Sequence, residues 1–537
     1  MLSRMLSFVC VAVAYAAGPH AAEVDKIFAA YNTHTPGCAV GVAEKGAAVL
    51  TAGYGMADLE RNVAITADTV FESGSVAKQF TAAALILLAQ QGKISLDDPM
   101  RKYLPELQDY GAPLTIRHVL SHTSGIREWR ALAAFSGYPE GKYTLSNQDL
   151  LRIASMQRAL NFDPGSNYSY TNTGFNISTI LIERALGDGR SFQRYTQDVM
   201  FGPLEMTHTR WRDDFRAVVP HRALAYRPLQ EGGFAQLTPI ENIIGAGGLL
   251  TTVGDLLRWN ENFSHAKVGG RAMVELQQTP ATLTSGRKIS YAAGLTVSTV
   301  DSLREVSHGG ATGGYRTWLG RYPDQQVSVA VLCNSASANA QALGRATARL
   351  WTGAKPAPEE PVAAGDPAKL AEFAGRYRQV RDNTVSTIEV KDGKLRLDGV
   401  TVRPAGDGRF AFGSSGSELR FESGNPRLFR FISSTDDILY ERVDPWTPTT
   451  ADLAAFAGAY TSNETGATVR ILAGDKAGEL RMQIAAEPAV TLKPAFRDTF
   501  TTSAGASIRF LREANGKVTG MSAGESRVWD LRFVRVP

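Results

Sequence analysis

Cysteine and clustered charge are both scarce in this sequence. Three cysteines in 537 residues are too few for a disulfide scaffold. Cys38 and Cys333 lie in apolar segments, so we expect two buried small side chains there. The formal charge is only +4, and no basic run is interleaved with aromatic residues. This composition argues against nucleic acid as a partner.

The sequence also has no apolar run long enough to span a membrane, and the apolar run at its N-terminus is short. Residues 5–17 fall well below the roughly 20 apolar residues that span a bilayer. One arginine precedes this run, and small-residue sites follow at 14–16 and 20–22, as is typical of a cleavable signal peptide over residues 1–22. We therefore expect a periplasmic or secreted protein without a membrane anchor, from which Cys10 has been removed.

The rest of the chain divides into regions of different composition. Residues 23–352 have strand-like runs near both ends and helical runs between them, which predicts an α/β unit around a mostly antiparallel sheet flanked by helices. Residues 353–366 are rich in Pro, Ala and Gly and predict a linker. Short alternating runs broken by Gly turns follow, and they predict antiparallel β structure without a long helix.

The C-terminal region contains an internal repeat. LAEFAGRY begins at Leu370 and LAAFAGAY begins at Leu453, an offset of 83 residues (453 − 370). Two copies are too few for a solenoid. We therefore expect two similar small β-barrels or sandwiches in tandem, at 367–446 and 450–537.

The first candidate for chemistry is the pair Ser75 and Lys78, at the start of an apolar helical run. A spacing of i to i+3 places the hydroxyl and the amine on one face of a helix. Serine becomes a nucleophile when a base removes its proton, and a lysine in apolar surroundings can have a pKa low enough to do so. Such pairs also arise by chance, so other motifs must support this one.

Two further motifs lie at suitable distances. Tyr-Thr-Asn at 170–172 comes just before a predicted helix, and His-Gly-Gly at 308–310 comes at the start of a predicted strand. In this order, Ser-x-x-Lys, Tyr-x-Asn and His-x-Gly resemble the motifs of the serine β-lactamase and penicillin-binding-protein superfamily, in its class C-like branch, peptidase S12. ATGGYRTWLGRYP and TIRHVLSHTSGI are similar to that family as well. The two β units resemble the architecture of serine D-aminopeptidases.

This resemblance implies a serine hydrolase that works through an acyl-enzyme, with no metal or organic cofactor. Ser75 would be the nucleophile, and Lys78 and Tyr170 would transfer its proton. The resemblance also makes His308 a catalytic residue on the opposite wall of the site and Asn172 a ligand of the substrate amide. Gly309 and Gly310 would let the substrate approach the strand edge closely. The backbone N–H groups of Ser75 and Ala311 would form the oxyanion hole.

The scaffold does not fix the substrate, because D-amino-acid peptidases, carboxylesterases and β-lactamases share it. The histidine of the third motif and the two C-terminal units favour amide or peptide bonds of D-amino-acid-containing peptides, including cell-wall fragments. Esters come second and β-lactams third. The alternative from another class is a penicillin-recognising binding protein that is acylated without turnover.

Two other motifs are interpreted as structural. GMSAG at 520–524 matches the nucleophile elbow of α/β-hydrolases, but the last histidine is His308, so a triad in the order Ser, acid, His cannot be completed. We expect a hairpin turn there. His118 and His122 have metal-clamp spacing, but position 119 is Val where a metalloprotease has Glu, so we expect a helix end leading into a loop.

Overall fold

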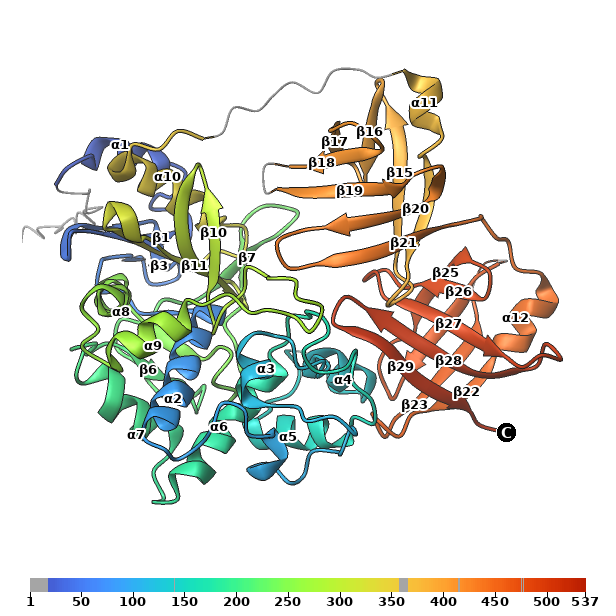
Figure 1. Ribbon diagram of the computed structural model, residues 1–537, viewed down its shortest axis with the longest axis horizontal. Coiled ribbons are helices and arrows are strands. Elements are labelled where there is room, and N and C mark those ends of the chain that lie inside the picture. Colours follow the sequence, from blue (N-terminus) through green and yellow to red (C-terminus); the bar gives the residue numbers. More distant parts are fainter. Residues whose placement is uncertain (1–17, 140, 357–365, 414–415, 475, 477) are drawn as a thin grey trace, which may run out of the picture.

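The computed structural model describes residues 18–537 with the exception of 140, 357–365, 414–415, 475 and 477. Residues 1–17 of the predicted signal peptide and 357–365 of the predicted linker lie outside the described residues. Figure 1 shows an α/β part on the left and two β-barrels on the right, one above the other. No helix in the described part of the chain is long and apolar enough to cross a membrane.

A six-stranded antiparallel sheet organises the α/β part, in the order β10-β11-β12-β13-β1-β2. Strands from the two ends of this part meet where β1 pairs with β13. The predicted α/β unit on an antiparallel sheet is therefore confirmed. The bounds are β1 (Cys38–Glu44), β2 (Ala47–Tyr54), β10 (Thr296–Val300), β11 (Leu303–Thr312), β12 (Tyr315–Tyr322) and β13 (Val327–Cys333).

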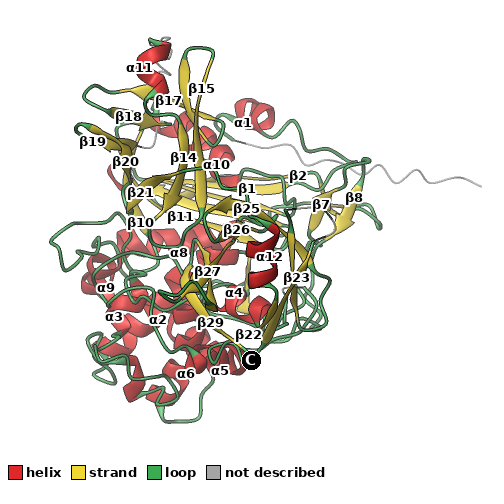
Figure 2. Ribbon diagram, turned by 90° about the vertical axis from the view of Figure 1, so that its right-hand side faces the viewer, coloured by secondary structure: helices red, strands yellow, loops and turns green. Residues whose placement is uncertain are grey.

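Alternate residues of β13 face two different cores. Val329 and Val331 pack on the side of α10, whereas Ala330 and Leu332 pack on the side of α8. The period of two in a strand produces this division. Figure 2 shows the resulting layers, with helices on both sides of the sheet. The covering helices are α8 (Val253–His265) and α10 (Ala340–Thr352).

Helix α2 (Lys78–Gln90) is central, because every residue from Lys78 to Leu88 is buried. Its apolar composition on all sides requires such a position. The other helical elements of this part are α1 (Ala21–Ile27), η1 (Gly74–Ala77), η2 (Met100–Lys102), α3 (Ile116–Leu120), α4 (Trp129–Phe135), α5 (Asn147–Met156), α6 (Thr173–Leu186), α7 (Phe192–Thr196), η3 (Gln197–Phe201), α9 (Gly270–Gln277) and η4 (Pro323–Gln325). The short strands are β3 (Met56–Asp58), β4 (Val63–Ala64), β5 (Phe71–Glu72), β6 (Arg210–Trp211), β7 (Tyr226–Pro228), β8 (Phe234–Gln236) and β9 (Leu249–Thr251).

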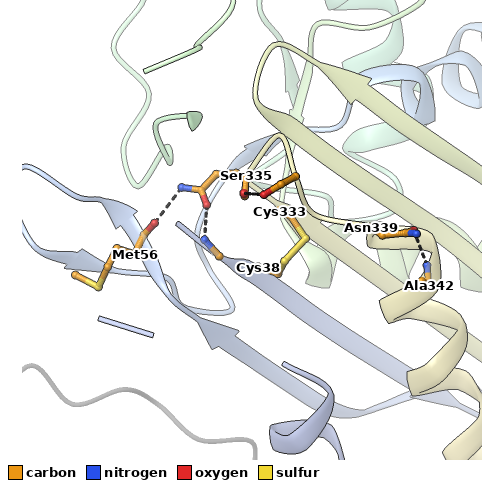
Figure 3. Close-up of a disulfide and its surroundings, with 9 residues drawn as sticks. Cys38, Met56, Cys333, Ser335, Asn339 and Ala342 are labelled. Atoms are coloured by element: carbon orange, nitrogen blue, oxygen red, sulfur yellow. Dashed lines mark hydrogen bonds between the residues drawn. A yellow bond between two sulfur atoms is a disulfide. The ribbon is translucent and has the colours of Figure 1, made fainter. Parts of the chain in front are cut away.

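Cys38 and Cys333 form a disulfide between β1 and β13 (Figure 3). They are direct partners in the antiparallel register, with Cα atoms 4.0 Å apart. The expected burial of both side chains is confirmed, and the sequence had left open whether they pair. The sequence could not reveal the pair, because 295 positions separate the cysteines and only the sheet register brings them together.

The His-Gly-Gly motif lies in the second half of a strand, and the prediction that it starts the strand is wrong. β11 begins at Leu303, after a tight turn at 301–302 in which Asp301 and Ser302 both have positive φ. Asn-Gly or Asp-Gly is the common sequence for such a turn, so Asp-Ser does not mark the hairpin clearly. Residues 308–312 pair with β12 alone, because the pairing with β10 ends at Ser307. One edge of β11 is therefore open.

Two closed eight-stranded barrels follow, which confirms the predicted pair of antiparallel β units. The helices here, α11 (Pro367–Ala371) and α12 (Thr450–Phe456), are short in the described residues, as predicted. The first barrel contains β14 (Gly375–Gln379), β15 (Val385–Lys391), β16 (Lys394–Leu397), β17 (Val400–Pro404), β18 (Arg409–Phe412), β19 (Ser417–Glu422), β20 (Asn425–Ile432) and β21 (Asp437–Val443). The second contains β22 (Gly458–Thr461), β23 (Thr468–Ala473), β24 (Leu480–Ile484), β25 (Val490–Phe496), β26 (Thr499–Thr501), β27 (Ser507–Arg512), β28 (Val518–Glu525) and β29 (Val528–Arg535).

The sequence repeat makes the same contact in both barrels. The hydroxyl of Tyr377 donates to the carbonyl oxygen of Phe373 at 2.8 Å, and that of Tyr460 donates to Phe456 at 2.7 Å. Both tyrosines are fully buried. Each bond fastens the segment before the barrel to the first strand, so the repeat recurs at the same place in each barrel.

GMSAG lies inside β28, so the expected hairpin turn at 520–524 is wrong. A Cβ on Gly524 would lie 1.9 Å from the carbonyl oxygen of Asp382 in the first barrel. This glycine therefore permits the backbones of the two barrels to touch. The hydroxyl of Ser522 donates to Asp530.

The second barrel is joined to the α/β part by a buried ion pair. Arg127 Nη1 lies 2.5 Å from Glu464 Oε2, and both side chains are less than a tenth exposed. Arg127 also donates to the carbonyl oxygen of Asp530 at 2.8 Å. Removal of one partner would leave a buried charge uncompensated. The pair therefore holds the barrel firmly in place.

Candidate active site

Ser75 and Lys78 lie where η1 passes into α2. Lys78 Nζ donates to Ser75 Oγ at 3.1 Å. The i to i+3 spacing therefore brings the Ser75 hydroxyl and the Lys78 amine into contact.

Lys78 is completely buried and its amine contacts two acceptors besides Ser75. These are Asn172 Oδ1 at 2.7 Å and the carbonyl oxygen of Ala246 at 3.0 Å. Burial holds the pKa of Lys78 well below its usual value, although the Glu128 carboxylate acts in the opposite direction. A lowered pKa increases the fraction of neutral amine, which is the form that can accept a proton from Ser75.

Glu128 fixes Asn172, and no motif in the sequence marks Glu128 as part of the site. Its Oε2 accepts from the backbone N–H of Asn172 at 2.7 Å, and its Oε1 accepts from Nδ2 at 3.1 Å. Glu128 is only 3% exposed. Asn172 itself stands directly before α6, where the sequence predicted a helix to begin. An amide nitrogen carries a second hydrogen, and this one is the candidate donor to a substrate carbonyl.

Tyr170 lies beside both groups, with its ring centroid 4.8 Å from Lys78 Nζ. Burial raises the pKa of the Tyr170 hydroxyl above its usual value, and a hydrogen bond with Ser75 offsets only part of this effect. The hydroxyl is therefore protonated at neutral pH. The hydroxyl can pass a proton between groups, but its ionised form, the phenolate, is disfavoured as a permanent base.

His308 lines the same cavity, and both of its ring nitrogens are engaged within the protein. Nδ1 lies 2.6 Å from the Gly309 carbonyl oxygen, and Nε2 lies 2.8 Å from the Tyr291 hydroxyl. Burial, together with the nearby charge of Lys78, lowers the pKa of His308 to about 4. The ring is therefore neutral at pH 7, and it shapes the wall of the site without offering a free base.

The turn that carries Ser75 packs on the face of the hairpin formed by β11 and β12. Thr317 Oγ1 donates to the carbonyl oxygen of Ser73 at 2.6 Å, and a Cβ on Gly310 would lie 2.1 Å from that same oxygen. The absence of a side chain at Gly310 therefore allows the backbone of Ser73 to lie against β11. Through this contact Ser75 and Ala311, the two predicted oxyanion residues, line one cavity.

The cavity has a volume of about 680 Å³, and positive charge predominates on its walls. Arg130, Arg316 and Arg527 line it, and Glu241 is the acidic residue among the lining positions. Arg130 is paired with Glu241 at 3.1 Å. Guanidinium groups bind carboxylates well, so the walls favour a substrate that carries a negative charge.

Arg527 comes from the second barrel, at the turn between β28 and β29. Its Cζ lies 4.9 Å from the centre of the Tyr170 ring, and Nη1 lies 4.0 Å from Glu128 Oε2. Asn161 holds this turn, because it donates to the Arg527 carbonyl oxygen and accepts from the N–H of Trp529. The second barrel thus supplies a side chain to the cavity, and no spacing to the three motifs marks it in the sequence.

His118 and His122, which have the i to i+4 spacing of metal ligands on a helix, do not lie on the same helix. His118 caps the start of α3, and α3 ends at Leu120, before His122. In the described residues, no group of three or more His, Cys, Asp or Glu side chains is arranged to hold a metal ion. The predicted helix end leading into a loop is confirmed.

Comparison with known proteins agrees with this geometry. Residues 24–353 match the family model described as Beta-lactamase. The chain belongs to the Beta-lactamase family. The resemblance based on the three motifs is therefore confirmed, and the family relationship supports a hydrolase.

Two relatives and one solved structure illustrate the relationship. The chain is 30% identical over 329 residues to a D-aminopeptidase of Gluconobacter oxydans, covering 61% of this chain and 60% of that protein. It is 26% identical over 428 residues to penicillin-binding protein 4* of Bacillus subtilis, covering 73% and 92%. The penicillin-binding protein homologue of Pyrococcus abyssi has a similar fold, with a TM-score of 0.56, 22% identity, and coverage of 78% and 98%. The alignment thus spans about six-tenths of the D-aminopeptidase.

The neighbouring glycines Gly309 and Gly310 provide a matched pair of variants. Gly310→Ala would place a methyl group 2.1 Å from the Ser73 carbonyl oxygen, whereas Gly309→Ala would meet its nearest atom at 3.8 Å. We expect Gly310→Ala to slow acylation of Ser75 about 100-fold, because small misplacements of reacting groups are that costly. Gly309→Ala should react with a small fluorophosphonate probe within a few-fold of the wild type. Probe-labelling rates, with melting curves to verify folding, measure both, and equal rates would refute the packing argument.

Proposed function

We propose that the protein is a serine hydrolase that forms an acyl-enzyme on Ser75 and cleaves amide or peptide bonds, with D-amino-acid-containing peptides as the favoured substrates. The observation that carries the proposal is the 3.1 Å contact of Ser75 Oγ with the buried amine of Lys78. A lone surface serine has no such base within reach.

The reaction follows from the positions of these groups. Ser75 Oγ bonds to the substrate carbonyl carbon as its proton passes to Lys78, directly or through Tyr170. The backbone amides of Ser75 and Ala311 stabilise the oxyanion. The proton then moves to the leaving amine as the carbon–nitrogen bond breaks. Water adds to the acyl-enzyme by the reverse proton route, releasing the acid and restoring Ser75.

The substrate class rests on the D-aminopeptidase relative and on the two barrels behind the site. A panel of D-aminoacyl amides, their L-counterparts, p-nitrophenyl esters and a chromogenic cephalosporin tests it. We expect the highest kcat/KM for a D-aminoacyl amide, then esters, then the cephalosporin. Faster cleavage of L-amides or of the cephalosporin would overturn this assignment. Labelling of Ser75 without turnover of any substrate would favour the acylatable binding protein.

Arg527 gives a prediction about specificity. Arg527→Ala removes a guanidinium from the cavity wall, so we expect kcat/KM to fall about 10-fold for a peptide with a free carboxylate, relative to the same peptide with its carboxylate amidated. Arg532→Ala is the matched control, because Arg532 is an exposed arginine of the same hairpin that pairs with Asp530. An unchanged ratio for Arg527→Ala would show that the second barrel does not select charge.

We also propose that the protein works outside the cytosol, in the periplasm or as a secreted protein. The N-terminal sequence supports export, and the disulfide supports an oxidising compartment. Cell fractionation, with a count of free thiols in the recovered protein, tests this. Cytosolic protein that keeps residues 1–22 and has three free thiols would refute it.

A further inference from the structure

Tyr291 contacts His308 of the active site, but the proposed reaction gives it no role. A carbonyl oxygen only accepts hydrogen bonds, so Nδ1 of His308 must donate to Gly309. The neutral ring then has an acceptor at Nε2, and the Tyr291 hydroxyl donates to it at 2.8 Å. Tyr291 is only 3% exposed. The two bonds together hold His308 in one neutral tautomer.

Aromatic packing fixes the ring of Tyr291 from several sides. Its centroid lies 4.6 Å from His122, 5.7 Å from His308 and 6.2 Å from Tyr170. His122 is itself fully buried and packs on Tyr170 at 4.1 Å. Tyr291 is therefore wedged between the Tyr170 side and the His308 side of the site.

The first barrel holds the chain just before Tyr291. Arg287 Nη2 donates to the carbonyl oxygens of Ser433 and Asp436, both at 2.7 Å. The backbone N–H of Ser290 donates to the Ser434 carbonyl oxygen at 3.0 Å, and the two hydroxyls of these serines are 2.9 Å apart. We call these contacts of Arg287 and Ser290 with the turn 433–436 the barrel latch.

The turn of the barrel latch is itself well ordered by its own hydrogen bonds. It joins β20 to β21, and Ser433 Oγ accepts from the backbone N–H groups of Thr435 and Asp436. A chain of contacts thus runs from the first barrel through Ser290 to Tyr291, and from there to His308 and the strand edge that carries Ala311.

We propose that Tyr291 is a positioning residue for acylation, which acts by holding the His308 ring in one tautomer and orientation, bonded to the Gly309 carbonyl, and that the barrel latch keeps Tyr291 in place. The inference rests on the proposed acyl-enzyme function. It gives the first barrel a part in the reaction without placing any of its residues at the reacting atoms.

Loss of the Tyr291 hydroxyl should change the protonation of His308 in a known direction. A bond donated to neutral Nε2 stabilises the neutral ring, so its removal raises the pKa of His308. The titratable groups that face this ring are Lys78 of α2, Tyr170 before α6, His122 after α3 and Tyr291 itself. Of these, the cation of Lys78 opposes a second charge at His308.

The first experiment uses Tyr291→Phe, which keeps the ring and deletes the hydroxyl. In protein with ¹⁵N-labelled histidine, with the His308 signal assigned by its loss in His308→Asn, the pKa of His308 should rise by about one unit from about 4. Fluorophosphonate labelling of Ser75 should slow about 10-fold. Tyr168→Phe is the matched control, because Tyr168 belongs to the same buried cluster, whereas the hydrogen bond to His308 Nε2 comes from Tyr291. It should leave both readouts unchanged.

The second experiment tests the barrel latch without touching the aromatic cluster. Arg287→Ala should shift both readouts in the same direction as Tyr291→Phe, by a smaller amount. The double variant should be no worse than Tyr291→Phe alone. Arg430→Ala is the control on the barrel side, because Arg430 pairs with Asp437 across the same hairpin. It should behave as the wild type.

The outcomes separate the two proposals. Wild-type titration of His308 and wild-type labelling in Tyr291→Phe would overturn the role of Tyr291. A shift in Tyr291→Phe with none in Arg287→Ala would overturn the role of the barrel latch. If the wild-type protein is not labelled at Ser75 at all, the proposed function fails, while the histidine titration still tests the contact. If Tyr291→Phe does not fold, Arg287→Ala carries the test alone.

Discussion

Ser75→Ala is expected to abolish hydrolysis of every substrate, with a fall in kcat of about 10⁴-fold or more. The variant removes the hydroxyl oxygen that forms the acyl-enzyme in the proposed reaction, and Lys78 and Tyr170 then have no proton to transfer. Folding should be retained, because deletion of one hydroxyl at a helix start changes stability by no more than about 1 kcal/mol. Turnover on the substrate panel and a thermal melt measure the two effects.

Ser522→Ala is the control for this prediction. Ser522 is the central residue of GMSAG, but it lies inside β28 and donates to Asp530, and no histidine follows His308 in the sequence. Activity should stay at the wild-type level. An inactive Ser522→Ala together with an active Ser75→Ala would show that the nucleophile has been assigned to the wrong part of the chain.

Lys78→Met and Tyr170→Phe should each lower the rate of acylation about 100-fold or more, because each removes part of the proton route. Methionine fills the buried volume of Lys78 without bringing a charge. The variant leaves Asn172 Oδ1 and the Ala246 carbonyl oxygen without their donor, so a melting curve must accompany the rate. Tyr170→Phe keeps the ring contact with His122. Single-turnover labelling of Ser75 isolates the acylation step from later steps.

The two effects should not add. Lys78 and Tyr170 serve one proton transfer, so the double variant should be about as slow as the worse single variant. Multiplied effects would mean that the two groups act independently. Near-normal acylation in Lys78→Met would exclude the lysine as the base.

The sequence contained the parts of the site that are encoded locally. Ser75 and Lys78 are three residues apart on one helical segment, so their contact follows from the spacing alone. Asn172 could be placed because α6 begins directly after it. The barrels were predictable from the repeat, since Tyr377 and Tyr460 recur with the same neighbours and make the same contact.

The remaining features depend on contacts between distant parts of the chain. Glu128 and Tyr291 reach the site only through folding, and no spacing to Ser75 marks either of them. Arg527 arrives from the second barrel on a turn that Asn161 holds. GMSAG is a strand because it pairs with β27 and β29, and Asp382 of the other barrel fills the space beside Gly524. A sequence pattern cannot register such neighbours, because they are chosen by packing.

The disulfide makes the α/β part a covalent ring. Residues 38–333 form this ring, and Ser75, Lys78, Tyr170 and His308 all belong to it, whereas both barrels form a tail outside it. A protease that cuts the exposed segment 231–233 would open the polypeptide without freeing either piece. The fragments would separate on a denaturing gel only after reduction. Nicked protein can therefore keep all four side chains on one covalently connected molecule.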